Sequence, residues 1–207
     1  MMITRPDMTD TRADSRTGTS TRAGPGSAPP AIRPAVEADL APFFAYLDDH
    51  LRDNGAGGTP LFQPLLHGQA RLPPGLRIAF IKGLTQPVGS PGWRRLWLAL
   101  GPTGNIAGHV DLRCRPEPAA AHRAMLGTGV HRLYRRQGLG ARLVDTAVAW
   151  ARAGTGLAWI DLEVLSANEP AVALYLRSGF TTIARIADMV RVDGASHDLS
   201  YMTRALR

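Results

Sequence analysis

The sequence predicts a single α/β domain in which helices flank a mixed, mostly antiparallel central sheet. Apolar residues recur with strand or helix periodicity in the order strand, helix, long connection, three strands, helix, strand, helix and two strands. The 207-residue length suits one domain, and 44% hydrophobic with 20% charged residues is typical of a globular chain. No run approaches the roughly 20 apolar residues of a membrane helix, so no membrane partner is expected.

The first 30 residues differ in composition from the rest of the chain. Residues 1–30 are mainly Thr, Arg, Ser, Gly and Pro, with almost no large apolar side chains. Such a segment cannot bury enough surface to offset its ordering entropy, and it lacks the apolar core of a signal peptide. We therefore predict a disordered tail over 1–30 and a folded domain over 31–207.

The first part of the domain is predicted to hold a short strand, a helix and a long connection. The strand is expected at Ala31–Pro34, and apolar residues at helical spacing between Leu40 and Leu47 predict a helix over Glu37–Arg52. Residues 59–92 are rich in Pro and Gly and predict an irregular connection with a short helix near Leu61–Arg71.

Three strands are expected in the middle of the chain. Arg94–Leu100 and Ile106–Arg113 flank a Gly- and Pro-containing turn at 101–105, which predicts a hairpin. Met125–Leu133 is the third predicted strand.

The second half alternates helices with strands. Apolar residues from Leu139 to Ala151 lie on one helical face, and the helix is expected to end at Gly154. The remaining predicted elements are a strand at Leu157–Leu165, a helix at Asn168–Ser178 capped by Gly179, and strands at Phe180–Met189 and His197–Met202 around an Asp193-Gly194 turn.

The net charge of +7 is a weak guide to partners. Lys82 is the only lysine among 24 cations, and the arginines are scattered rather than clustered, which indicates codon bias more than a nucleic-acid surface. A ligand with several phosphates would also exploit this excess. The single Cys114 excludes an internal disulfide and a cysteine-built metal site, and no other spacing suggests a metal. It fits a reducing compartment, so we expect a cytoplasmic protein.

The stretch Arg135–Gly140, read RRQGLG, is a candidate phosphate-binding turn. A helix that begins near Gly138 has unpaired N–H groups and about half a positive charge at its start, and glycines at 138 and 140 leave room for an anion. The alternative is a glycine-containing helix start with two solvated arginines. The pattern is neither the dinucleotide fingerprint nor the P-loop.

A second stretch, Asp161–Phe180, makes the first more specific. It contains Leu-Glu-Val at the end of a strand, then Asn168, Leu-Tyr at 174–175 and Gly-Phe at 179–180. Together with the Arg/Gln-x-x-Gly-x-Gly/Ala pattern one helix earlier, it resembles the GCN5-related N-acetyltransferase (GNAT) family. The resemblance covers roughly 31–207, is strongest over 126–180, and is closest in motif to the ribosomal-protein N-terminal acetyltransferase branch.

The resemblance implies transfer of an acetyl group from acetyl-CoA to a primary amine, with no metal. It implies that amides around the turn hold the CoA pyrophosphate and that the 128–130 strand pairs with the pantetheine arm. A bulge at Thr128-Gly129 would splay that strand and free an N–H for the oxyanion. The implied cofactor-binding residues are Thr128, Gly129, Val130, Arg135, Arg136, Gln137, Gly138, Leu139, Gly140, Ala141 and Asn168.

Two residues match the family's catalytic positions. An alkyl amine with a pKa near ~10.4 is only about one part in 10³ neutral at pH 7, so a base is useful, and Glu163 matches that position. Tyr175 matches the general acid for the CoA thiolate. The alternatives are a solvated carboxylate, a tyrosine packed on the sheet and, for Asn168, an N-cap.

The acceptor stays open at this point. His109, Asp111 and Arg113 share one strand face and either line an acceptor groove or are solvated. Asp48, Asp49 and Asp53 either attract a cationic amine or form an exposed helix face. A small amine and a protein N-terminus both fit, a homodimer is neither required nor excluded, and a non-catalytic acyl-CoA-binding module of the same fold is the rival interpretation.

Overall fold

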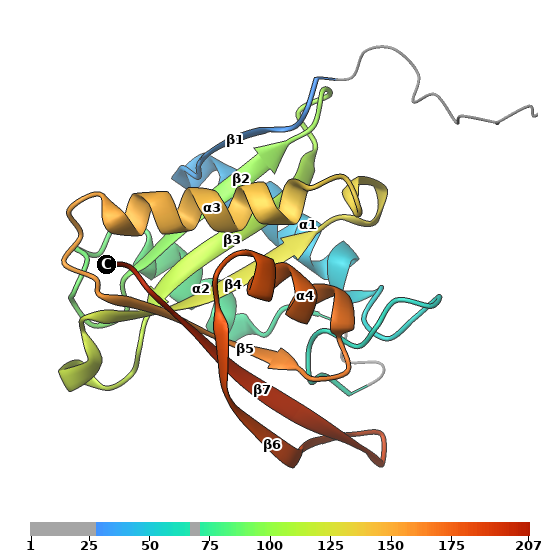
Figure 1. Cartoon of the computed structure of the whole chain (residues 1–207). Helices are drawn as coiled ribbons and strands as arrows, with labels where there is room; N and C mark the ends of the chain where they lie inside the picture. Colours follow the sequence, from blue (N-terminus) through green and yellow to red (C-terminus); the bar gives the residue numbers. More distant parts are fainter. Residues whose placement is uncertain (1–27, 67–70) are drawn as a thin grey trace, which may run out of the picture.

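A computed structural model describes residues 28–66 and 71–207. These residues form one seven-stranded sheet in the order β1-β2-β3-β4-β5-β7-β6 (Figure 1). The strands are β1 (Ala31–Pro34), β2 (Arg94–Leu100), β3 (Ile106–Cys114), β4 (Arg123–Val130), β5 (Trp159–Leu165), β6 (Thr181–Val192) and β7 (Ala195–Ala205). The helices are α1 (Leu40–Leu51), α2 (Pro74–Gly83), α3 (Leu139–Arg152) and α4 (Glu169–Arg177).

The helices cover the two faces of the sheet as separate layers. In Figure 1, α3 and α4 lie in front of the sheet and α1 and α2 behind it. The front core packs α3 against β2–β5 through side chains such as Leu143 and Ile160. The rear core packs α1 and α2 against β2 through Phe43, Phe80 and Leu98. The predicted fold class, a mixed and mostly antiparallel sheet flanked by helices, is confirmed.

The pairing of β4 with β5 is the one parallel pairing in the described sheet, and it is short. It runs from Arg123↔Trp159 to Met125↔Asp161 and then stops, although both strands continue. The strands therefore diverge beyond Met125. The bulge expected at Thr128-Gly129 is absent, because the β3–β4 register is continuous from Gly108↔Val130 to Cys114↔Ala124.

The predicted elements agree with the structure apart from the long connection and several boundaries. The predicted helix near Leu61–Arg71 is wrong, since 61–66 are irregular and the helix of this region is α2. Pro60 and Pro64 lack backbone N–H donors, whereas Pro74 begins α2 at a position where proline is tolerated. The third strand ends at Val130, before a 3₁₀ turn at Arg132–Tyr134. The predicted 1–30 tail falls almost entirely outside the described residues.

The turn between β6 and β7 follows its sequence signal. Asp193 and Gly194 both have positive φ, 48° and 84°, as a two-residue type I′ hairpin requires.

Within the described residues, no helix is both long and apolar enough to cross a membrane.

A buried ion pair joins β2 to β3 on the rear face. The Arg94 Nη1 donates to Asp111 Oδ2 at 2.9 Å, and both side chains are at most 7% exposed. The Arg94 guanidinium also lies 4.0 Å from the centroid of the Phe80 ring. Removing one partner of such a pair leaves a buried charge without compensation.

We expect Asp111→Asn to lower the free energy of unfolding by about 3–5 kcal/mol, because Arg94 would stay buried without a counter-charge. Urea denaturation followed by circular dichroism measures this. Asp188→Asn is the matched control, since the Asp188–Arg191 pair is exposed and its loss should leave the unfolding midpoint nearly unchanged. Equal effects of the two substitutions would contradict the prediction.

Candidate active site

The divergence of β4 from β5 leaves backbone groups of β4 without a strand partner. The His131 N–H donates to the Ala107 carbonyl at 2.9 Å, and the β3–β4 register is continuous. Because antiparallel pairs alternate, Gly129 exchanges hydrogen bonds with β3, while the N–H groups of Thr128 and Val130 are directed toward β5. Of the three predicted strand residues, Thr128 and Val130 thus offer backbone donors and Gly129 does not.

The predicted turn lies at the start of α3 and is exposed. Arg136 and Gly138 both have left-handed backbone conformations, with φ of 60° and 76°, and Gly138 is the N-cap of the helix. Arg136, Gln137 and Gly138 are exposed, and the first amides of α3 follow directly. The Gln137 side chain donates to the Leu133 carbonyl at 3.0 Å, which holds the turn. An anion can reach these amides.

The two glycines of the turn have different functions. A Cβ at Gly138 would meet no atom within 4 Å, so this position is open to solvent. A Cβ at Gly140 would lie 3.0 Å from Leu174 Cδ2, so Gly140 allows α3 to approach α4 closely. Only Gly138 provides the clearance that the sequence suggested for both. Leu139 is 2% exposed and belongs to the core, so only its backbone amide can contact a ligand.

A hollow of about 180 Å³ adjoins the turn. It is lined by Pro29, Pro30, Tyr134, Gln137, Leu139 and Arg142.

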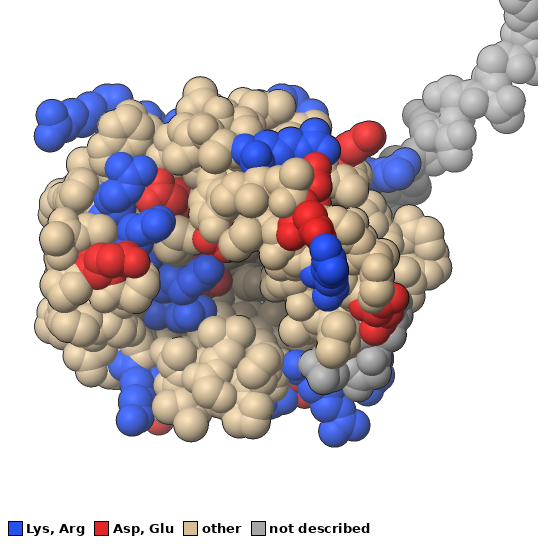
Figure 2. All heavy atoms as spheres, turned by 90° about the horizontal axis from the view of Figure 1, so that it is seen from below, with Lys and Arg blue, Asp and Glu red and all other residues tan. Residues whose placement is uncertain are grey.

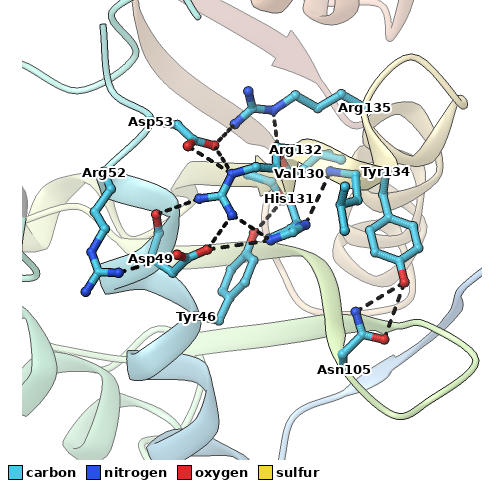
Figure 3. A network of polar contacts seen from close by, with 12 residues as sticks. Tyr46, Asp49, Arg52, Asp53, Asn105, Val130, His131, Arg132, Tyr134 and Arg135 are labelled. Carbon is cyan, nitrogen blue, oxygen red and sulfur yellow. Dashed lines mark hydrogen bonds and ion pairs between the residues drawn. The ribbon is translucent and has the colours of Figure 1, made fainter. Parts of the chain in front are cut away.

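The Arg135 guanidinium is occupied within the protein (Figure 3). Its three nitrogens donate to the Val130 carbonyl, the Thr59 hydroxyl and the Asp53 carboxylate at 2.9–3.2 Å. It therefore ties the end of β4 to the segment after α1. Arg135, predicted as a cofactor-binding residue, therefore has partners for its guanidinium within the protein, whereas Arg136 has no ion-pair partner among the described residues.

The three aspartates at the end of α1 are also paired. Asp48 accepts from Arg77 at 2.5 Å, and Asp49 and Asp53 both bind Arg132 at 2.9–3.0 Å. Hydrogen bonds from Arg132 hold the pKa of Asp49 below its ordinary value. Because each carboxylate faces an arginine, their predicted alternative function of attracting a cationic amine is not supported.

Tyr175 lies on α4 in the core of the front layer. It is 7% exposed, its ring packs edge-on against Phe180 at 5.9 Å, and burial raises its pKa to about 12. The hydroxyl therefore stays protonated across the physiological range. Asn168 is the N-cap of α4, and its side-chain oxygen accepts from the Ala171 N–H at 3.4 Å. Its N-cap function is thus observed, and its amide NH₂ has no partner within the described part of the chain.

Glu163 lies on the diverging half of β5 and is exposed. It stands opposite Tyr201 in the β5–β7 pairing. The negative charge of Glu163, burial and a hydrogen bond from the phenol to Glu163 raise the pKa of Tyr201. Tyr201 was not singled out in the sequence, since only the pairing of distant strands brings it to Glu163.

A buried histidine pair lies against β4 on the rear face. A Cβ at Gly129 would lie 2.7 Å from the His109 ring and 2.9 Å from His50 Nε2. The Tyr46 hydroxyl lies 3.2 Å from His109 Nδ1 and donates to the Gly129 carbonyl at 3.3 Å. The interpretation of His109 and Asp111 as solvated is wrong, since both side chains are buried. His50 and Tyr46 were missed, because their helical pattern indicates only a core face.

Comparison with known proteins agrees with this geometry. Residues 85–180 match the family model described as Acetyltransferase (GNAT) family. The chain has the GNAT fold. The GNAT acetyltransferase of Streptococcus pneumoniae superposes with a TM-score of 0.69 at 24% identity, over 84% of this chain and 98% of that one. No curated protein matches the chain in sequence.

Two further solved structures share the GNAT fold. The ribosomal-protein-alanine N-acetyltransferase of Brucella melitensis has a TM-score of 0.68 at 19% identity, over 84% of this chain and 99% of that one. A phosphinothricin acetyltransferase of Sinorhizobium meliloti in complex with acetyl-CoA has a TM-score of 0.66 at 18% identity, over 85% and 88%. The family model matches residues 85–180, and these neighbours share the fold of the chain.

The buried histidine pair predicts acid sensitivity. Burial lowers the pKa of both His50 and His109 to about 3, and each ring also faces positive charge. The unfolded chain binds protons below pH ~6.5 that the folded protein does not bind. The free energy of unfolding is therefore highest above about pH 6.5. It decreases as the pH falls below this value, by up to about 1.4 kcal/mol per pH unit for each histidine.

Urea unfolding at pH 7, 6 and 5 measures this slope. We expect His109→Gln to reduce the loss of stability between pH 7 and 5 by about half relative to the parent protein, each compared with its own value at pH 7. Identical slopes in the two proteins would contradict the prediction.

Proposed function

We propose that this protein is an acetyl-CoA-dependent N-acetyltransferase that acts on a primary amine by direct attack in a ternary complex. The observation that carries the proposal is the divergence of β4 from β5, with the amide-bearing start of α3 and the hydroxyl-bearing Tyr175 of α4 on the same side of the sheet. A linear ligand with an anionic end and an amide-containing arm fits this arrangement.

The chain supplies the donors that such a ligand needs. The amides from Arg136 to Ala141 and the side chain of Arg136 would hold the pyrophosphate at the helix start. The N–H groups of Thr128 and Val130 would pair with the pantetheine arm as an added strand, and one of them would stabilise the oxyanion of the tetrahedral intermediate. Asn168 would contribute its free amide NH₂ and still cap α4.

Glu163 would take the proton of the attacking amine. Its carboxylate is exposed on the half of β5 that diverges from β4, so an amine and a bridging water can reach it. Tyr201 stands opposite it in the β5–β7 pairing. An amine with a pKa near 10.4 needs about 4–5 kcal/mol to become neutral at pH 7. The carboxylate would accept the remaining proton as the nitrogen bonds to the carbonyl carbon and becomes acidic.

Tyr175 would donate to the departing sulfur. A pKa of about 12 keeps the phenol protonated, so the donor is always available. Complete transfer to a free thiolate with a pKa of about 8.5 is uphill by roughly 5 kcal/mol. Tyr175 therefore acts as a hydrogen-bond donor that stabilises the developing thiolate as the carbon–sulfur bond breaks.

A non-catalytic acyl-CoA-binding module of the same fold is the alternative. The placement of Glu163 and Tyr175 on the two elements that flank the divergence favours the enzyme. Assignment to the ribosomal-protein branch stays a prediction, because structures of other acetyltransferases, including one named for spermidine, also share the fold. The cytoplasmic location also stays a prediction.

We expect Tyr175→Phe to bind CoA as the parent does and to lose turnover by about 10- to 100-fold, since it lacks the donor but keeps the packing. Calorimetry with CoA and thiol release from acetyl-CoA with a panel of amines measure the two quantities. Unchanged turnover would contradict the assignment of Tyr175 as the hydrogen-bond donor to the departing sulfur. Failure of the parent protein to bind CoA would overturn the proposed function.

We expect Glu163→Gln to lower kcat/KM at pH 7 by about 10²-fold or more, with a deficit that narrows as the pH rises toward the pKa of the amine. The narrowing follows because the amine then deprotonates without a base. Glu37→Gln, an exposed glutamate before α1, is the matched control. A deficit that is constant from pH 7 to 10 would indicate a positioning function for Glu163 instead.

A further inference from the structure

The rear face of the sheet carries an arginine without a full counter-charge. Arg94 and Arg113 stand opposite each other in the β2–β3 pairing, and both reach the same oxygen of Asp111. Arg94 takes it at 2.9 Å and is buried, whereas Arg113 lies at 3.3 Å with 35% of its side chain exposed. Two guanidinium groups therefore share one carboxylate, and the contact with Arg94 is the shorter of the two.

Arg113 has no other polar partner among the described residues. Its Nε and Nη2 make no hydrogen bond there, and no second carboxylate of those residues lies within 4 Å of it. The neighbouring arginines of this face differ. Arg115 and Arg123 share Asp161, Arg115 also approaches Glu117 at 3.7 Å, and Arg123 donates to Thr203 as well.

The position of Arg113 connects it to the proposed reaction. A Cβ at Gly127 would lie 2.6 Å from Asp111 Oδ1 and 3.2 Å from Arg113 Nη1, so both side chains lie over β4 at this glycine. Gly127 follows the last β4–β5 pair, Met125↔Asp161, and precedes the two residues with free N–H groups. Arg113 is thus beside the place where the thioester would react.

The same face has space for a small molecule. A hollow of about 160 Å³ is lined by Arg115, Arg123, Asp161, Ile183, Tyr201 and Met202. Of these, Tyr201 is the cross-strand neighbour of Glu163. Figure 2 shows the molecule from below, where it is hollowed and both basic and acidic side chains lie near the rim. Arg115 and Arg123 in its lining are paired with Asp161, so it is the available volume that favours a small molecule over a folded protein surface.

We propose that the acceptor is a small amine that carries a carboxylate or similar oxyanion close to the amino group, and that Arg113 binds this acidic group. This inference rests on the proposed acetyltransferase function and narrows its substrate. A guanidinium with two unused donor positions can bind an oxyanion through two parallel hydrogen bonds. A protein N-terminus without a neighbouring acidic group would leave Arg113 uncompensated.

The test compares amines that differ in this charge alone. Thiol release from acetyl-CoA is measured with the twenty protein amino acids and with the carboxamide of each. The amide member of each pair has the less basic amine, so solution chemistry alone favours the amide. We expect at least one amino acid to be acetylated with a kcat/KM about tenfold or more above that of its amide.

Arg113→Ala is expected to reduce that preference by about tenfold or more, with the larger loss in KM, and Arg113→Lys to restore part of it. Arg207→Ala, which removes an exposed arginine at the end of the chain, is the control and should keep the preference.

The outcomes separate the two proposals. Three results would each overturn the inference and leave the transferase proposal standing. They are carboxamides that react as well as their amino acids, a preference for the amino acid that survives Arg113→Ala, and CoA binding without turnover of any pair. A protein that does not bind CoA would overturn both.

Discussion

The short parallel pairing of β4 with β5 is the constraint on which the rest of the structure depends. Three register pairs hold the strands together, and both continue for several residues without each other. Backbone donors left without partners are costly when buried, so this region has to stay accessible to water or to a ligand. The sheet is otherwise paired continuously across β4, because β3 holds its other edge in one register. An added strand-like ligand is the natural completion of this edge.

Glycines determine which side chains can lie against β4 on the rear face and how closely α4 approaches α3 on the front face. On the rear face, Gly127 and Gly129 leave room for Arg113 and for the histidine pair, which lie directly against the strand. On the front face, Gly140 lets Leu174 approach α3, which fixes the helix that carries Tyr175. Cofactor and acceptor would thus meet at one strand from opposite faces. The polar groups nearest to β4 can lie against the strand because its glycines carry no side chain.

Local patterns in the sequence were sufficient for most of the fold. Helix α3 and the β6–β7 hairpin follow from periodicity and turn residues, and the two motifs indicated the site. The sequence could not show which carboxylates each arginine would meet, because these partners are far apart in the chain. Arg135 illustrates this, since it looks like an anion ligand but binds Asp53, 82 positions earlier. The burial of His109 was hidden for the same reason, since its cover comes from α1.

The distribution of charge around the site bears on how the amine loses its proton. A positive group next to an ammonium favours its neutral form, and the effect is strongest where water is partly excluded. Arg113, which is only half compensated by Asp111, would act on the amine in this way while holding the acidic end of the same molecule. Glu163 would then accept a proton from an amine that is already less basic than in water. Recognition and activation of the acceptor would draw on the same half-compensated charge.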